Sequence, residues 1–178
     1  MSVTVDVRGL NECLMAVHGL DKRTRAAIAS ATGRSLIAGR TAISKGVRSQ
    51  YSVKAGTVKG AMKLQKASDK LSGEIRISGR TLDLMEFSPR ISRKGMVSVR
   101  IKKSRKRLPH SFFVATGKAG LYHRMGKGRL PIEREYTLSV PQMAGNTVVA
   151  EQVLNRMQEV FEERLAHALE YGNGHNYK

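Results

Sequence analysis

The hydrophobic pattern of the N-terminal part of the chain changes from a strand-like to a helix-like period. Valines at every second position predict a half-buried strand over residues 2–8. Residues 11–48 have a helical period, and a break at residues 18–21, with Asp21 as a new N-cap, divides them into two helices. In the second helix the large apolar residues fall within an arc of about 100°, and the basic residues lie opposite. The apolar positions are Ile28, Leu36, Ile43 and Val47, and the basic positions are Arg23, Arg34, Lys45 and Arg48.

Turn residues and alternation predict a series of short elements in the middle of the chain. Small residues such as Gly39 line the flanks of the second helix, so another element can approach it closely. Further along, apolar residues that alternate with polar ones indicate strands with one face in the core. We expect a loop and a short helix over residues 49–67, a strand over residues 73–78, a turn at residues 79–80 that leads into residues 82–87, a strand over residues 96–101, and a turn or strand extension over residues 102–107.

A β-hairpin is predicted next. Residues 111–116 and 120–125 are expected to pair as its two strands. Gly117 and Gly120 supply the permissive backbone that a short connection between strands needs.

Residues 126–143 are predicted to leave this sheet as an extended arm. Pro131 and Pro141 each remove a backbone donor and bias the preceding residue towards extended conformations. Neither a central strand nor a helix is therefore expected in the arm.

The last predicted helix is amphipathic and acidic. Asn146 or Thr147 caps it, it runs to about Tyr171, Gly172 ends it, and residues 172–178 form a frayed tail. Because the rest of the chain is basic, this helix is expected to pack against its own body or against a neighbouring copy. Its apolar residues are Val149, Val153, Met157, Val160, Phe161, Leu165 and Ala168, and its acidic residues are Glu151, Glu159, Glu162, Glu163 and Glu170.

These elements predict a single α+β domain over residues 1–178, with a mainly antiparallel sheet flanked by a long N-terminal helix and a C-terminal helix. A chain of 178 residues can bury a core of its own. The single Cys13 excludes an intramolecular disulfide framework and a cysteine-only zinc site. The sequence has neither an uncharged run as long as a membrane span nor the pattern of a signal peptide, so neither is expected.

Positive charge is concentrated in one quarter of the chain. The formal net charge is +18, and residues 90–134 contain fourteen Lys or Arg and one acid, Glu133. Like charges at this density repel, so they are either spread over a solvated surface or neutralised by an acidic partner, protein or nucleic acid. The densest part is a basic patch formed by Lys102, Lys103, Arg105, Lys106 and Arg107.

The sequence shows no set of residues with the spacing of a catalytic or metal site. His110 and His123 lie in or near the hairpin, where a histidine is more often a surface or pairing residue than a general base. Cys13 fits a small buried residue better than a reactive thiol. The glycines at residues 117–120 and 126–129 lack the Walker spacing and a following helix, so they indicate turns. We therefore expect no enzymatic activity, no cofactor and no metal.

Nucleic-acid binding is the alternative function that the charge raises. A strongly basic domain binds nucleic acid through salt-dependent contacts that do not read the base sequence. Aromatic residues are few, and no recognition motif of the RNP, zinc-finger or KH type is present. The sequence thus allows non-specific binding and does not support specific readout.

An ordered series of short motifs resembles the minor tail protein Z family of tailed bacteriophages and prophages. The series begins in a long helix rich in Ala and Arg, and order and spacing match over about residues 20–170. The motifs are Tyr-x-Val-Lys at residues 51–54, Leu-x-x-Phe at residues 84–87, Phe112 or Phe113, Arg124, Gly-Arg-Leu-Pro-Ile at residues 128–132 and Ser-Val-Pro-Gln-Met at residues 139–143.

The resemblance implies a structural virion protein without enzymatic activity, which completes the tail and helps join it to the head at the neck. It also implies an α+β design and a six-fold ring of copies. The implied partners are further copies in a hexamer, the tail terminator, the tail tube or head-neck connector proteins, with non-specific contact to the phage genome and no membrane. The implied location is the head-proximal end of the tail, after assembly in the cytoplasm of the bacterial host. The basic residues at 102–107 do not match the family pattern.

The basic hairpin and the arm are expected to reach across to adjacent subunits or to neck proteins. Three arginines would give charge-assisted, bidentate contacts to carboxylates, a role that lysine fills less well. An apolar anchor beside them is stiffened in advance by proline, which lowers the cost of ordering. The alternative is that the arm folds back on its own sheet. The expected interface residues are Arg124, Arg129, Leu130, Pro131, Ile132 and Arg134.

Overall fold

The computed structural model describes most of the predicted elements. The described residues are 2–3, 22–68, 70–115 and 117–173. The predicted first helix with Cys13, and all but the start of the predicted strand over residues 2–8, lie outside them. The last five residues of the predicted tail also lie outside them.

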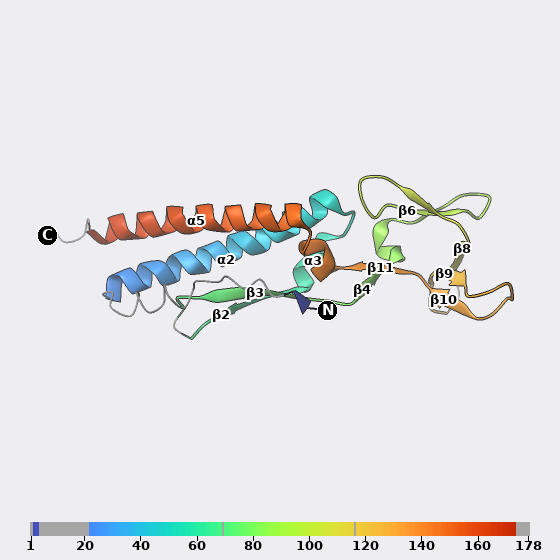
Figure 1. The fold of residues 1–178 in the computed structure, drawn as a ribbon, viewed down its shortest axis with the longest axis horizontal. Coiled ribbons are helices and arrows are strands. Elements are labelled where there is room, and N and C mark those ends of the chain that lie inside the picture. The colour runs from blue at the N-terminus through green and yellow to red at the C-terminus, as the bar shows by residue number, and fades with distance from the viewer. Residues whose placement is uncertain (1, 4–21, 69, 116, 174–178) are drawn as a thin grey trace.

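Two long helices and a small antiparallel sheet form one half of the molecule, in which α2 lies between α5 and the sheet (Figure 1). We call this part the helical half. Helix α2 confirms the predicted second helix and extends two residues beyond its expected end. The sheet has the strand order β1-β3-β2. The elements are α2 (Lys22–Gln50), α5 (Thr147–Asn173), β1 (Ser2–Val3), β2 (Met62–Lys66) and β3 (Gly73–Ser78).

Helices α2 and α5 pack closely because small residues of α2 face α5. A Cβ atom on Gly39 would lie 2.5 Å from Met157 Sδ, and one on Gly46 would lie 3.0 Å from Val149 Cγ1. Ser35 Oγ donates a hydrogen bond of 2.7 Å to the Met157 carbonyl. The predicted close approach of another element to this helix is therefore confirmed, and the sequence order of these contacts makes the two helices antiparallel.

Strand β2 lies where the sequence pattern predicted only a loop and a short helix. The short helix exists as α3 (Ala55–Gly60), but Met62–Lys66 pairs with β3 along its whole length, with Leu64 opposite Ile75. The prediction missed a strand because only two apolar residues alternate with polar ones here. A pattern this short is difficult to distinguish from the end of a helix.

A ribbon of two antiparallel strands, β4 (Thr81–Asp83) and β11 (Tyr136–Ser139), connects the helical half to a second part of the molecule. We call residues 84–135, which lie between these strands in sequence, the distal lobe (Figure 1). It starts with a short 3-10 helix and contains two antiparallel sheets, of order β5-β6-β7 and β10-β9-β8. Its elements are η1 (Leu84–Phe87), β5 (Arg90–Ile91), β6 (Val97–Val99), β7 (Lys106–Leu108), β8 (Ser111–Val114), β9 (Gly120–Arg124) and β10 (Ile132–Arg134).

One apolar core runs through both parts of the molecule. Val47 and Ile77 of the helical half belong to the same buried cluster as Phe87, Val99 and Leu121 of the distal lobe. The predicted strand over residues 96–101 is confirmed in its centre, where β6 buries its two valines. Because the core is continuous, the distal lobe is packed onto the helical half and does not depend on the two linking strands alone.

The predicted hairpin over residues 111–125 is confirmed, and the predicted arm is corrected in two places. Strands β8 and β9 pair antiparallel, and Gly117 in their connection has a φ of +70°, which favours glycine. Ile132–Arg134 does not leave the sheet, because it pairs with β9 as the edge strand β10. An edge strand tolerates the neighbouring Pro131, whose missing donor does not interrupt the ladder.

The second correction is the helix α4 (Val140–Ala144), which forms where proline led us to expect none. Pro141 stands in its first turn, where the missing N–H has no partner within a helix anyway. Ser139 and Gln142 form a capping box, in which the Ser139 side chain accepts from the Gln142 N–H. The helix turns the chain from β11 into α5.

Helix α5 begins where one of the two predicted caps is found. Asn146 Oδ1 accepts a hydrogen bond of 3.1 Å from the Val148 N–H, so Asn146 is the cap. The helix continues through Gly172 to Asn173 and not only to Tyr171. With two long helices and antiparallel sheets, the predicted α+β class is confirmed, although the described strands divide among four small sheets.

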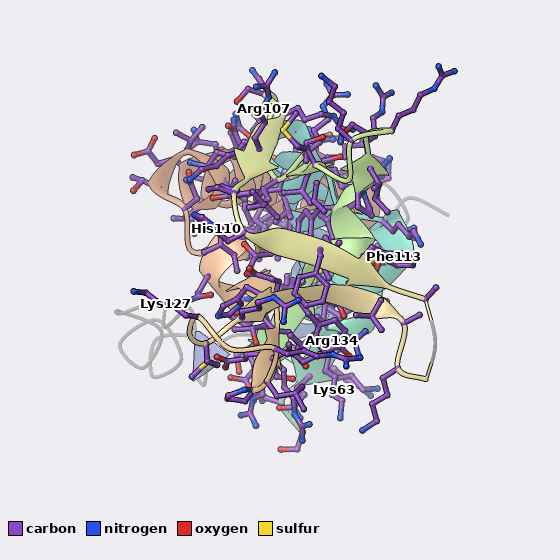
Figure 2. The ribbon with its side chains drawn as sticks, turned by 90° about the vertical axis from the view of Figure 1, so that its right-hand side faces the viewer. Lys63, Arg107, His110, Phe113, Lys127 and Arg134 are labelled. Atoms are coloured by element: carbon purple, nitrogen blue, oxygen red, sulfur yellow. The ribbon has the colours of Figure 1, made fainter. Side chains whose placement is uncertain are left out.

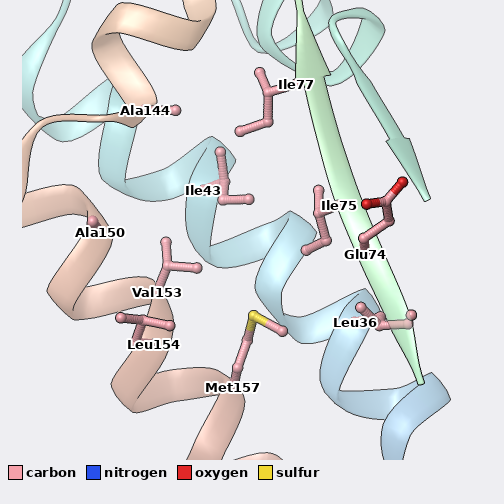
Figure 3. A pocket seen from close by; sticks show the side chains of 11 residues that line it. Leu36, Ile43, Glu74, Ile75, Ile77, Ala144, Ala150, Val153, Leu154 and Met157 are labelled. Carbon is pink, nitrogen blue, oxygen red and sulfur yellow. The ribbon is translucent and has the colours of Figure 1, made fainter. Parts of the chain in front are cut away.

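An apolar cavity of about 100 Å³ lies between α5, α2 and β3 (Figure 3). Met157 and Leu154 of α5 face Ile75 and Leu36 across it, and Glu74 lies at its edge. With a single carboxylate beside aliphatic side chains, this cavity offers no set of groups for acid–base or metal chemistry.

Candidate interaction surface of the distal lobe

The distal lobe carries most of the positive charge of the protein. Residues 84–135 contain fourteen Lys or Arg and three acids, which gives a net charge of +11 out of +18 for the whole chain. Figure 2 looks onto this end of the molecule, where Arg107 lies at one edge and Lys127 projects at another. The charge therefore surrounds the outer end of the lobe and is not confined to one strand.

The predicted basic patch divides into exposed cations and one that has internal partners. Lys102 and Lys103 lie in the connection between β6 and β7, and Lys106 and Arg107 are exposed on β7. Arg105 is half-buried. The patch thus leaves four exposed cations for a partner.

Arg105 connects three segments of the distal lobe. Its Nη1 donates hydrogen bonds of 3.0 Å to the carbonyls of Ser88 and Ser98. Desolvation, together with the positive charges of Arg90 and Arg100, lowers the pKa of Arg105. The guanidinium remains protonated at neutral pH because its ordinary pKa lies far above that range. Its role in the fold is to hold β6 against the turn before β5.

A polar hollow of about 160 Å³ lies where the end of α2 meets the connection between β6 and β7. Four cations from two distant parts of the sequence line it, and Lys102 Nζ lies 5.9 Å from the centroid of the Tyr51 ring. The basic hollow, as we call it, is lined by Arg48, Ser49, Gln50, Tyr51, Ser52, Arg100, Lys102 and Lys103. Within the described parts of the chain, none of the four cations has a carboxylate partner.

The loop between β9 and β10, residues 125–131, is the part of the predicted arm that projects into solvent. Met125 is 60% exposed and Leu130 is 72% exposed. Arg129 and Pro131 are exposed as well. Two large apolar side chains beside an exposed arginine are typical of a contact surface.

Two of the arginines predicted for the interface have partners within the protein. The Arg124 guanidinium lies 5.2 Å from the centroid of the Phe112 ring and donates a hydrogen bond to the Arg129 carbonyl, so it holds the loop on the hairpin. Arg134 forms an ion pair with Asp83 and donates a 3.0 Å hydrogen bond to the Ala119 carbonyl. Ile132 is half-buried in β10.

Gly120 has a role that the turn argument did not predict. It is buried, and a Cβ atom on it would lie 3.0 Å from Arg134 Nε. Because Gly120 has no side chain, the Arg134 guanidinium has room to lie across the hairpin.

A cluster of Ser111, His123 and Glu135 on the hairpin has the residue types of a hydrolase triad but a different geometry. Ser111 Oγ donates a 2.9 Å hydrogen bond to Glu135 Oε1, and His123 Nδ1 lies 3.2 Å from the same oxygen without the alignment of a hydrogen bond. A triad needs the serine to donate to the imidazole. His123 also lies 3.8 Å from Glu133, so it is a pairing residue, as expected from the sequence.

The part of the chain that the structure describes has neither a metal-binding cluster nor a membrane-spanning helix. No group of three or more His, Cys, Asp or Glu there could hold a metal ion. No helix there is both long and apolar enough to cross a membrane.

The sequence did not reveal the basic hollow or the partners of the arginines. Arg48 and Arg100 are separated by more than fifty positions, and Asp83 is as far from Arg134 in the chain. Of the four cations that line the hollow, the sequence singled out only Lys102 and Lys103, as part of the basic patch.

The family comparison gives one match, which covers almost the whole chain. The family model of prophage minor tail protein Z (GPZ) matches residues 7–172. The match includes α2, the distal lobe, α4 and nearly all of α5. No curated protein and no solved structure matches the chain. The chain therefore belongs to the prophage minor tail protein Z family, and it is a structural protein of the bacteriophage tail.

Proposed function

We propose that this protein completes the tail at its head-proximal end and helps join the tail to the head, as a ring of copies that also contacts the tail terminator, the tail tube or the head-neck connector. The ring is proposed to be a hexamer that assembles in the cytoplasm of the bacterial host. The family membership supports a role in the tail. The exposed loop between β9 and β10 is the observation that supports contacts with a neighbour.

Contacts tie the loop to the hairpin on both sides, which favours binding. Arg124 anchors it to the hairpin from one side, and β10 anchors it from the other. Because little conformational freedom remains to be lost, exposed Leu130 and Pro131 can dock at low entropic cost. In this proposal Arg129 contacts a carboxylate of the neighbour, while Arg124, Ile132 and Arg134 support the loop from within.

We propose further that the protein has no enzymatic activity. The geometry of the Ser111, His123 and Glu135 cluster supports this, because the serine hydroxyl donates its hydrogen bond to the carboxylate and not to the imidazole. A structural role needs contact surfaces only, and the distal lobe provides them.

Immunogold electron microscopy of purified particles tests the location. Gold confined to the head-proximal end of the tail is the expected result. Label at the far end of the tail would overturn the proposal. So would complete particles in which neither labelling nor peptide mass spectrometry detects the protein. Particles assembled without the gene serve as the control for antibody specificity.

Non-specific nucleic-acid binding is the second candidate, because the distal lobe has a net charge of +11. Retention on duplex DNA separates the two functions. A protein whose function is DNA binding should remain bound near physiological salt, although its affinity falls steeply between about 50 mM and about 200 mM salt. A tail protein that meets the genome only incidentally should be retained at low salt alone.

A further inference from the structure

Acidic side chains of this molecule collect on α5, although the chain outside the distal lobe also has a net positive charge. The outer end of the distal lobe is basic, while α5 carries five glutamates and two arginines, a net charge of −3. All five glutamates are exposed. In Figure 1 the C-terminal end of α5 points away from the distal lobe. The protein thus has an acidic surface that its own basic end does not cover.

The structure shows no ion pair between a glutamate of α5 and another described element of the protein. Among the described residues, the ion pairs of its glutamates stay within the helix: Arg156 with Glu159 at 3.0 Å, and Arg164 with Glu163 at 3.9 Å. Glu162 accepts a hydrogen bond from Gln158, again within the helix. The sequence left open whether this helix packs on its own body or on a neighbour. Its apolar side packs on α2, and its acidic side remains available.

Glu159, Glu162 and Glu163 do not reach the basic hollow of their own chain. Because Gly39 of α2 lies beside Met157, Glu159 stands near the middle of α2. Arg48 is nine residues further along α2 than Gly39, and a helix rises about 1.5 Å per residue, so more than about 13 Å of packed helix separates the two sites. These three glutamates can therefore meet a basic hollow only in a second copy.

We propose, building on the ring in the proposed function, that copies of this chain join head to tail, with the acidic face of α5 in one copy seated against the basic hollow of the next. Carboxylates of Glu159, Glu162 and Glu163 then neutralise Arg48, Arg100, Lys102 and Lys103. Each copy offers one surface of each kind. A contact between two different surfaces repeats from copy to copy and closes into a ring if the rotation allows.

An apolar residue flanks the acidic face of α5 and adds to the contact. Leu169 of α5 is 39% exposed and lies seven residues from Glu162, which places it on the same helix face. A contact with charged and apolar parts has the composition of a protein interface.

A second copy fits this hollow better than duplex DNA does. The hollow is concave and confined between a helix end and a loop, whereas a DNA backbone presents its phosphates along an extended line. A helix with glutamates one turn apart can place its carboxylates into such a hollow.

Charge reversal and charge exchange test the proposal in sedimentation velocity at low and at high salt. One variant carries Glu159→Lys, Glu162→Lys and Glu163→Lys, a second carries Lys102→Glu and Lys103→Glu, and a third combines all five changes. Each reversal alone should weaken self-association by about tenfold or more, since several exposed ion pairs of up to about 1 kcal/mol are lost. The combined variant should associate within about threefold of the original chain.

The control variant Lys59→Glu with Lys63→Glu makes the same charge change as the second variant on exposed positions of the helical half. It should leave self-association unchanged, and circular dichroism should show all variants folded. The proposal would be overturned if the charge reversals left self-association unchanged, or if the combined variant associated no better than either reversal alone. It would also be overturned if the original chain stayed monomeric at low salt. The hollow would instead be assigned to nucleic acid if the protein associated only in the presence of duplex DNA and if Lys102→Glu with Lys103→Glu abolished this association.

This outcome is separable from that of the proposed function. Gold label at the head-proximal end of the tail, together with charge reversals that do not affect self-association, would leave the tail role intact and reject the head-to-tail contact.

Discussion

Arg134 of β10 forms an ion pair with Asp83 of β4, and this pair ties the outer sheet of the distal lobe to the ribbon that connects it with the helical half. Both side chains are largely shielded from solvent, with exposed fractions of 29% and 18%. Asp83 also accepts a 2.8 Å hydrogen bond from the Met85 N–H and caps η1. One carboxylate therefore sets both the start of the lobe and the position of its last strand.

A double-mutant cycle with Arg134→Ala and Asp83→Asn should show that this pair stabilises the fold. Asparagine keeps an oxygen for the cap and removes the charge. The coupling free energy from urea unfolding is expected at about 1–2 kcal/mol, as for contacting residues in a partly shielded network. The exposed pair of Glu74 and Arg76 is the control, with an expected coupling below about 0.5 kcal/mol. Equal couplings for both pairs would contradict the structural role of Arg134.

Gly39→Ala should destabilise the packing of α2 against α5. The added methyl group would lie 2.5 Å from Met157 Sδ and 2.9 Å from Ile75 Cδ1, so two core side chains must shift. Overpacking of this kind costs about 1–3 kcal/mol. Gly56→Ala in α3 is the matched control, because nothing lies within 4 Å of its added methyl group. It should leave stability unchanged or raise it by up to about 1 kcal/mol. A similar shift of the urea midpoint in both variants would refute the prediction.

Phe87→Ala should destabilise both parts of the molecule together. Phe87 is fully buried in the cluster that joins the distal lobe to the helical half. Losing a buried phenylalanine costs about 3–5 kcal/mol. Phe113→Ala, at a side chain that is 37% exposed, should cost less than half as much. Thermal unfolding followed by circular dichroism should keep a single transition. Two separated transitions in the original chain would show that the core is not shared.

Leu130→Asp combined with Arg129→Glu should impair tail completion without affecting the fold. Both side chains are exposed in the loop between β9 and β10, and substitutions at such positions usually change stability by less than about 0.5 kcal/mol. The melting temperature should therefore stay unchanged, while a phage carrying the variant yields few complete particles. Loss of the folded monomer would mean that the loop packs on its own sheet. The matched control is Lys118→Glu in the connection between β8 and β9.

The sequence predicted the elements whose signals are local. The period of α2, the acidic and apolar sides of α5 and the glycine turn of the hairpin all depend on residues a few positions apart. Two local rules were applied too strictly, because proline at residue 141 stands in the first turn of a helix and proline at residue 131 precedes an edge strand. The short strand β2 was missed because its alternation involves only two apolar residues.

By itself, the sequence determined the α+β class, the family, the accumulation of positive charge and the acidic nature of the last helix, since each of these is carried by residue types and their spacing along the chain. Only the tertiary structure decided which charges are satisfied within the protein. It paired Arg134 with Asp83, joined Arg105 to the carbonyls of Ser88 and Ser98, and brought Arg48 and Arg100 to one hollow. These relationships depend on strand register and helix packing, which bring together residues that no periodicity connects.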